Sequence, residues 1–228
     1  GGEPLLRKDF FEILEAASKR LRTHFISNAT LLTEEKARRA VDLAPKRLGG
    51  KGLNFVGVSI DGPRELHDQI RSLPGAFDRS IEGIRRLIAF RKESRKKCPM
   101  VHVTTVVQDK NVDHLHEMPR VVAEAGADVC NLTLEIRTLE LPGIGEQAPD
   151  QYRMSQVTFP RIEPARLAKA LADTRAAARA AGIELRAPDM TDDAIVRYYD
   201  GKMDLSRFRC EIIWSRVIVG CKGDVYPC

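Results

Sequence analysis

Long apolar runs, a secretory leader and an even set of cysteines are all missing from this sequence of 228 residues. No apolar stretch approaches the roughly 18–20 residues of a membrane span, which argues against an integral membrane protein. The first residues lack the charged start and apolar core of a signal peptide, so we expect a cytoplasmic protein. Five cysteines without a secretory signal do not predict a disulfide framework.

Acidic residues are scarce in one segment of the chain. Seven cations lie between Arg85 and Lys97 against a single acid, Glu93, and the whole chain has a net charge of +5. A nucleic-acid surface is one interpretation, but the segment has too few aromatic rings for base stacking. We interpret it as the last turns of a surface helix, where cations suit the negative end of the helix dipole, and do not expect nucleic acid as a partner.

Short β-branched runs alternate with helical patterns along most of the chain. The runs predict strands near residues 24–28, 53–60, 100–107, 129–136 and 183–186. The patterns between them predict helices over residues 5–21, 33–48, 77–88, 112–125 and 164–181. Apolar strands alternating with helices indicate an α/β fold with a parallel sheet, either a full or partial (β/α) barrel or an open doubly wound sheet.

Two segments depart from this alternation. Residues 139–159 are rich in proline and glycine and show no period, which fits either a substrate lid or a surface insertion. Cys210, Cys221 and Cys228 crowd into the last 19 residues, a pattern that favours a local metal site. Cys98 and Cys130 are expected to be small core residues instead.

Two short motifs have the chemistry of a ligand site. In Gly1-Gly2-Glu3-Pro4, glycines allow close backbone approach to a ligand and Glu3 offers a carboxylate to an ammonium group. Ser59 and Asp61 lie two residues apart at the end of a predicted strand, where both could face a ribose or an amino-acid group. Each motif alone is also ordinary turn chemistry.

The order of the motifs is more specific than either one. The Gly-Gly-Glu-Pro segment is followed by Ser27-Asn28-Ala29, then by Ser59-Ile60-Asp61-Gly62-Pro63 and by His67-Asp68 with Arg71. This series resembles the radical S-adenosylmethionine (radical SAM) superfamily over essentially the whole chain. The resemblance implies a partial (β/α) barrel of parallel strands with outer helices.

The resemblance also implies roles for single residues. Gly1, Gly2, Glu3 and Pro4 match the motif that holds the methionine ammonium of S-adenosylmethionine. Asn28 matches the Asn of the family's Thr-Asn-Gly pattern, here Ser-Asn-Ala.

Later segments complete the implied cofactor site. Ser59 and Asp61 match residues that meet the ribose and carboxylate, and Arg71 is a weaker candidate for the carboxylate. Val107 and Asn111 resemble the segment that lines the adenine.

One family motif is not found in the sequence. The radical-generating [4Fe–4S] cluster of the family is held by three Cys, the second four and the third seven residues after the first, upstream of the Gly-Gly-Glu-Pro segment. No such triplet occurs here, and the first residue is not Met. We expect a fragment whose cluster ligands lie upstream and which is inactive by itself; a relative that lost its cluster is the alternative.

The end of the chain resembles the start of a SPASM domain, a module that holds an auxiliary [4Fe–4S] cluster. Cys210 and Cys228 are the implied ligands, and the residues between them predict a β-hairpin with Gly223 at its turn. Cys221 falls outside that pattern. The expected organisation is therefore a barrel over residues 1–195 and a partial auxiliary-cluster module over residues 196–228.

The predicted function is that of a radical SAM enzyme, which removes a hydrogen atom from a substrate with a 5′-deoxyadenosyl radical. The resemblance implies a peptide, protein or small-molecule substrate, tetrapyrroles included, and an electron donor such as a flavodoxin or ferredoxin. Two alternatives remain: a (β/α)-barrel enzyme acting on a phosphorylated metabolite, for which residues 142–145 are the only late glycine-rich loop, and a non-enzymatic α/β binding module.

Overall fold

The computed structural model describes residues 2–135, 161–203, 217–220 and 224–226. These residues form a five-stranded sheet in the order β1-β2-β3-β4-β5, and every neighbouring pair is parallel. The strands are β1 (Arg22–Ser27), β2 (Gly52–Ser59), β3 (Met100–Val107), β4 (Val129–Leu134) and β5 (Glu184–Arg186). The α/β class, the parallel sheet and all five strands are therefore confirmed.

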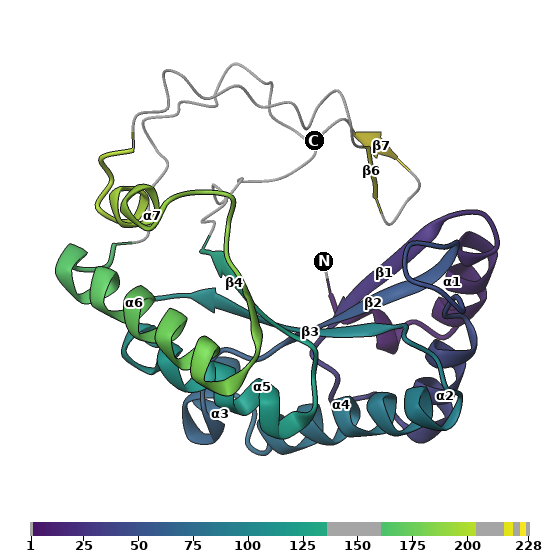
Figure 1. The fold of residues 1–228 in the computed structure, drawn as a ribbon. Helices are drawn as coiled ribbons and strands as arrows, with labels where there is room; N and C mark the ends of the chain where they lie inside the picture. The colour runs from purple at the N-terminus through teal and green to yellow at the C-terminus, as the bar shows by residue number, and fades with distance from the viewer. Residues whose placement is uncertain (1, 136–160, 204–216, 221–223, 227–228) are drawn as a thin grey trace.

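Helices connect the strands and cover one side of the curved sheet, while the N-terminus lies on the other side (Figure 1). The α-helices are α1 (Phe10–Ser18), α2 (Glu34–Asp42), α3 (Arg64–Arg71), α4 (Ala76–Glu93), α5 (Met118–Ala125), α6 (Pro164–Ala181) and α7 (Asp192–Tyr199). Two short 3-10 helices, η1 (Pro4–Leu6) and η2 (Val112–Glu117), precede α1 and α5. The alternating pattern left an open sheet and a barrel as alternatives, and this arrangement is the partial barrel that the family resemblance implied.

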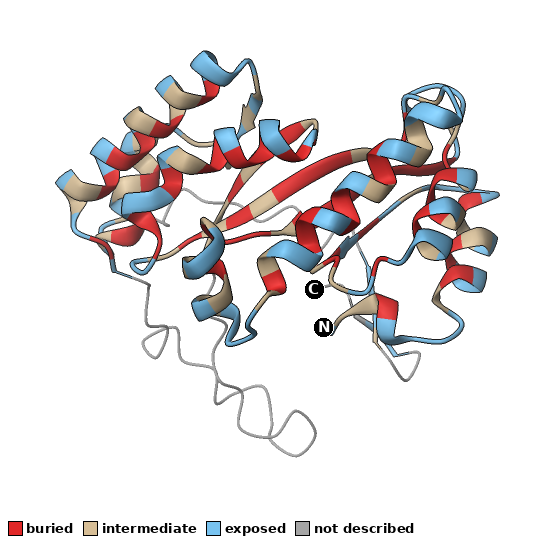
Figure 2. Ribbon diagram, turned by 90° about the horizontal axis from the view of Figure 1, so that it is seen from below, coloured by how far each residue is buried: buried red, intermediate tan, exposed pale blue. Residues whose placement is uncertain are grey.

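The core lies between the sheet and these helices. Burial alternates along the outer helices, whose inward faces are buried and whose outward faces are exposed (Figure 2). One core cluster joins β1, β2 and β3 to α1, α2 and α4, and a second joins the ends of β3 and β4 to α6 and α7. The parallel strands end at one common edge, and side chains that follow β1, β2 and β3 there become neighbours.

Three predicted helices are shorter than expected, and the one over residues 112–125 is divided into η2 and α5. The helix over residues 5–21 is divided into η1 and α1, because Arg7 is in an extended conformation. The helix over residues 33–48 ends at Asp42, three residues before Pro45, since the residue before a proline disfavours helix. Lys96 Nζ then donates to the carbonyl oxygens of Val41, Asp42 and Ala44, at 2.8–3.1 Å, and so caps the end of α2.

The sequence analysis did not predict α3 or α7. Both have a start signal in the sequence: Pro63 precedes α3, and Thr191 caps α7 before two acids in its first turn. Ile195 and Tyr199 of α7 belong to the second core cluster, so α7 spans the expected boundary at residue 195. The division into two domains stays a prediction.

The basic segment is the end of a surface helix, as predicted, but several of its cations have structural partners. Arg91 donates to both carboxylate oxygens of Asp128, at 2.6 and 3.0 Å. Arg86 donates to the carbonyl of Leu32 at 3.2 Å. These cations join α4 to neighbouring parts of the fold.

In the tail, β6 (Ile218–Val219) pairs antiparallel with β7 (Val225–Tyr226), which confirms the predicted hairpin. Residues 139–159, Cys210, Cys221 and Cys228 lie outside the described residues. Among the described residues, no helix is both long enough and apolar enough to cross a membrane.

Candidate S-adenosylmethionine site

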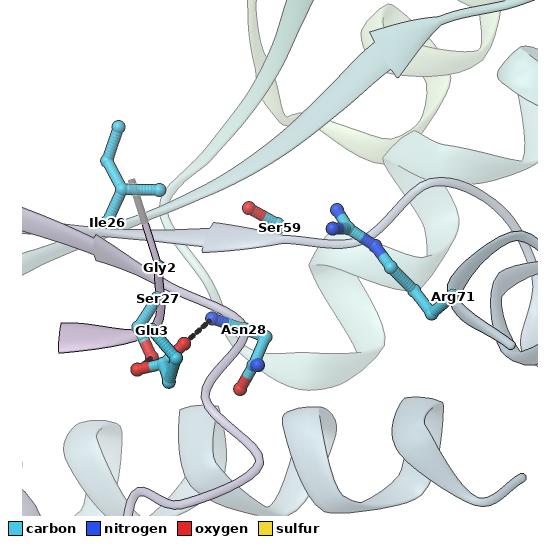
Figure 3. A pocket seen from close by; sticks show the side chains of 7 residues that line it. All are labelled: Gly2, Glu3, Ile26, Ser27, Asn28, Ser59 and Arg71. Carbon is cyan, nitrogen blue, oxygen red and sulfur yellow. Dashed lines mark hydrogen bonds between the residues drawn. The ribbon is translucent and has the colours of Figure 1, made fainter. Parts of the chain in front are cut away.

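A pocket lies where β1 and β2 end, and it brings together segments that are far apart in the sequence. It has a volume of about 230 Å³ and is lined by Gly2, Glu3, Ile26, Ser27, Asn28, Ser59 and Arg71. Figure 3 shows these residues around one space, with the Ser59 hydroxyl and the Arg71 guanidinium on the same side. Five of the residues that the sequence analysis assigned to the cofactor therefore share one pocket: Gly2, Glu3, Asn28, Ser59 and Arg71.

The carboxylate of Glu3 ties the start of the chain to the end of β1. Its Oε1 accepts hydrogen bonds from Leu5 N–H at 3.1 Å and from the Ser27 hydroxyl at 2.7 Å. Its Oε2 accepts from Asn28 N–H at 2.8 Å (Figure 3). Because a carboxylate oxygen has about two acceptor sites, Oε2 keeps one for a ligand ammonium.

A tight turn after β1 presents Asn28. The Asn28 Oδ1 accepts from both the backbone N–H and the hydroxyl of Thr30, which leaves its Nδ2 without a partner among the described residues. Ala29 follows with φ of 58°, a left-handed conformation that favours glycine. α4 supports the turn closely: a Cβ at Gly83 would lie 2.6 Å from the carbonyl oxygen of Ala29.

The opposite wall of the pocket comes from β2 and α3. Ser59 is the last residue of β2, and Arg71 is the last residue of α3. Arg71 forms an ion pair of 2.7 Å with Asp61, whose side chain is 3% exposed while that of Arg71 is 37% exposed. A cation held in this way, and reachable from the pocket, can bind a carboxylate.

Three residues that the later motifs predicted at the ligand do not line the pocket: Asp61, Val107 and Asn111. Asp61 is buried beneath Arg71, and its carboxylate pairs with Arg71 and Val106 N–H. Val107 ends β3 at the expected edge, but its side chain packs in the second core cluster. Asn111, the companion of Val107 in the predicted adenine segment, is fully buried and bonds to the backbone at 2.8 Å. Packing, rather than position in the sequence, decides where these side chains point. They hold the loops behind the pocket and do not face its interior.

Other residues of the motifs have mixed outcomes. Pro4 opens η1 and does not line the pocket, and Gly1 lies outside the described residues. Ser27 and Ile26 line the pocket although the sequence analysis gave them no role of their own. Side chains along β1 alternate between the two faces of the sheet, and this alternation could have predicted that Ile26 faces the pocket. Ile26 is 56% exposed, while its neighbours in the strand are buried.

No group of three or more His, Cys, Asp or Glu able to hold a metal occurs among the described residues. Cys98 and Cys130 are buried core residues, as predicted, and burial raises the pKa of the Cys130 thiol to about 12. Neither is placed to hold an iron–sulfur cluster at the pocket. The predicted auxiliary ligands, Cys210 and Cys228, lie outside the described part of the chain.

Fold and pocket together define a partial barrel with a polar pocket where its first strands end, and comparison of the sequence gives the family. The profile of the Radical SAM superfamily matches residues 1–135, which is more than half of the chain. The chain belongs to the radical SAM superfamily.

Several known proteins are similar to it. The AdoMet-dependent heme synthase of Methanosarcina barkeri is 35% identical over 154 residues, which cover 67% of this chain and 40% of that protein. The mycofactocin maturase MftC of Mycolicibacterium smegmatis is 29% identical over 152 residues, 66% of this chain and 34% of that protein. This chain therefore spans well under half the length of these relatives.

Solved structures support the fold. Streptococcus suis SuiB bound to S-adenosylmethionine superposes with a TM-score of 0.65 at 15% identity, covering 100% of this chain and 48% of SuiB. SuiB has also been solved with its precursor peptide SuiA. At this identity the likeness shows the partial-barrel fold.

Proposed function

We propose that this chain is the S-adenosylmethionine-binding part of a radical SAM enzyme. In this family, a reduced [4Fe–4S] cluster supplies the electron that cleaves S-adenosylmethionine to a 5′-deoxyadenosyl radical, which removes a hydrogen atom from the substrate. The single observation that carries the proposal is the pocket, where three motifs of the family converge on one space.

Each wall of the pocket has a part in binding. Gly2 and Glu3 receive the methionine ammonium, through the backbone and through the free acceptor site of Oε2. Arg71 faces them as a cation and binds the methionine carboxylate, with the Ser59 hydroxyl as a further donor. The Nδ2 of Asn28 donates to a ligand oxygen, since Oδ1 is occupied by Thr30.

The size of the pocket bears on how the cofactor fits. Its volume of about 230 Å³ is below the roughly 300–1,000 Å³ of sites that enclose a whole drug-sized ligand. A pocket with an acid on one wall and a cation on the other suits the charged amino-acid end of S-adenosylmethionine. The adenosine end would then extend along β2 and β3 beyond the described walls.

The cluster ligands must come from residues other than those described. A [4Fe–4S] cluster needs Cys thiolates, and the two described cysteines are buried in the core. We propose that the cluster is held by a three-Cys motif upstream of Gly1. Cys210 and Cys228 are proposed as auxiliary-cluster ligands, a role supported by the β6–β7 hairpin that lies between them.

The substrate is proposed from the relatives. A peptide is one candidate, because the mycofactocin maturase is a similar protein and SuiB has been solved with a peptide. A tetrapyrrole is the second candidate, favoured by the 35% identity to a heme synthase over two thirds of the chain. A flavodoxin or ferredoxin is the proposed electron donor.

The proposal is tested with the full-length protein after anaerobic reconstitution with iron and sulfide. We expect S-adenosylmethionine to bind in calorimetry and to yield 5′-deoxyadenosine when dithionite is added. Arg71→Gln should weaken binding by roughly 10–150-fold, as expected when a charged hydrogen bond worth about 1.5–3 kcal/mol is lost.

A matched control is available on the same helix. Arg64 also lies on α3, but it pairs with Asp78 outside the pocket, so Arg64→Gln should bind like the wild type. Equal weakening of binding by both substitutions would contradict the assignment of Arg71 to the binding site. No binding by the wild-type protein would refute the proposed function.

A further inference from the structure

The loop that follows β2 is held to β3 by hydrogen bonds. Ile60 N–H donates to Thr104 O at 3.0 Å, and the buried Thr105 hydroxyl donates to Ile60 O at 2.7 Å. Asp61 comes next and is 2% exposed. β3 therefore fixes the chain up to the residue that pairs with Arg71.

Every polar group of Asp61 has a partner inside the protein. Its N–H donates to His67 Nδ1 at 3.1 Å, and its carbonyl accepts from Asn111 Nδ2 at 2.8 Å. Its Oδ1 accepts from Val106 N–H at 3.3 Å, and its Oδ2 pairs with Arg71 at 2.7 Å. Two of these partners are on the carboxylate and two are on the backbone, and the 2% exposure of Asp61 leaves its carboxylate out of reach of a ligand.

His67 is the partner that the proposed function does not use. It is fully buried on α3, and its ring packs edge-on against Phe77 with the ring centres 6.2 Å apart. Because Nδ1 accepts the bond from Asp61, the ring proton lies on Nε2, which has no partner among the described residues. A buried donor without a partner costs free energy. The other ring nitrogen, Nδ1, still accepts from Asp61 N–H and so holds the backbone of Asp61.

We infer that His67 and Asp61 are positioning residues that fix the guanidinium of Arg71 for a carboxylate in the pocket. His67 holds the backbone of Asp61, and Asp61 Oδ2 pairs with one guanidinium nitrogen of Arg71, Nη2, which leaves its other N–H groups for the pocket. An arginine side chain has about 2 kcal/mol of rotamer entropy to lose, and fixing it before binding removes that cost from the binding step. The inference rests on the proposed function of the pocket.

The test compares two substitutions at residue 67 in the reconstituted full-length protein. His67→Phe keeps the ring and removes the acceptor, whereas His67→Asn keeps an acceptor near the position of Nδ1. We expect His67→Phe to weaken S-adenosylmethionine binding about 10-fold, the upper range for one hydrogen bond, and His67→Asn to recover most of it. In 5′-deoxyadenosine formation, KM for S-adenosylmethionine should rise while kcat changes by less than about 2-fold.

His102→Phe is the matched control for a general loss of packing. His102 is also a buried histidine whose Nε2 has no partner in the described part of the chain, but it lies on β3 and does not line the pocket. It should lower the unfolding temperature without changing the affinity. Equal weakening by both Phe variants, or unchanged affinity in a folded His67→Phe protein, overturns the inference.

Asp61→Asn decides the matter if His67→Phe does not fold. Removing a negative charge beside Arg71 should tighten carboxylate binding if charge alone matters. The positioning role predicts weaker binding instead, because Arg71 loses its anchor. Tighter binding overturns the inference while leaving the proposed function intact; no binding by the wild type overturns both.

Discussion

The carboxylate of Glu3 has both a structural and a binding task in the proposed site. Its three hydrogen bonds join η1 to the end of β1, and one acceptor site on Oε2 remains for a ligand. Glu3→Ala should therefore weaken S-adenosylmethionine binding by roughly 10–150-fold and also lower the free energy of unfolding by about 1–3 kcal/mol. Calorimetry and urea denaturation measure the two effects separately.

Glu12→Ala is the control for this prediction. Glu12 lies on the exposed face of α1 and pairs with Arg39 across the surface, an interaction worth at most about 1 kcal/mol. It should leave the affinity unchanged. Normal affinity in Glu3→Ala would limit Glu3 to its structural task.

Single residues also mark the limit of the sequence analysis at the site. Glu3, Asn28, Ser59 and Arg71 share one pocket because the order of the motifs follows the order of the strands, and their role in binding stays a prediction. Asp61 was expected to face the ligand, since it lies two residues after Ser59. The strand ends at Ser59, however, and beyond that point the alternation of side chains no longer applies.

At the scale of elements, α4 supports the turn that presents Asn28. Gly83→Ala would place a Cβ 2.6 Å from the carbonyl oxygen of Ala29, and backbone atoms cannot move aside cheaply. Alanine normally favours a helix interior over glycine by about 1 kcal/mol. We expect the clash to dominate, with a net loss of roughly 1–3 kcal/mol in the free energy of unfolding and weaker S-adenosylmethionine binding.

Chemical denaturation of Gly83→Ala, with Arg85→Ala as the control, measures the free energy of unfolding and checks this prediction. Arg85 lies on the exposed face of the same helix, so its removal should change the free energy of unfolding by less than about 0.5 kcal/mol. A higher free energy of unfolding in Gly83→Ala would contradict the prediction, because the turn at Ala29 would then have moved to make room for the new Cβ.

Elements were predicted to different degrees for physical reasons. The strands are short apolar runs between turn residues, and β3 and α6 have the predicted bounds. Helix ends were less predictable, since α2 is ended by Pro45 and a cap from Lys96, 54 residues after Asp42. α3 was missed because its eight residues are mostly polar, and only the fold buries His67.

For the whole molecule, buried histidines predict how stability depends on pH. Burial is the main cause that lowers the pKa of both His67 and His102 below the ordinary value of 6.5. The unfolded chain therefore binds more protons than the folded protein as the pH falls below about 6.5, and the free energy of unfolding decreases from there. Each histidine contributes a slope of at most about 1.4 kcal/mol per pH unit.

Urea denaturation at pH 7.5, 6.5 and 5.5 measures this slope. His102→Phe should show a flatter decrease than the wild type, because one titrating group is gone. Asp68 does not interfere, since its carboxylate caps α4 through Phe77 and Gly75 and its pKa is lowered below 3.8. A free energy of unfolding that stays constant over this range would contradict the prediction.

Tyr199 has a consequence for how far the polypeptide must extend. Its hydroxyl donates to the carbonyl of Val107 at 2.7 Å and accepts from Glu135 N–H at 2.9 Å. It therefore joins α7 to the ends of β3 and β4, which lie 92 and 64 residues earlier in the chain. During synthesis, neither hydrogen bond of Tyr199 can form until α7 has left the ribosome. A version of the protein that stops before residue 199 would therefore lack both hydrogen bonds, and the carbonyl of Val107 and the N–H of Glu135 would lose this partner even though β3 and β4 still pair.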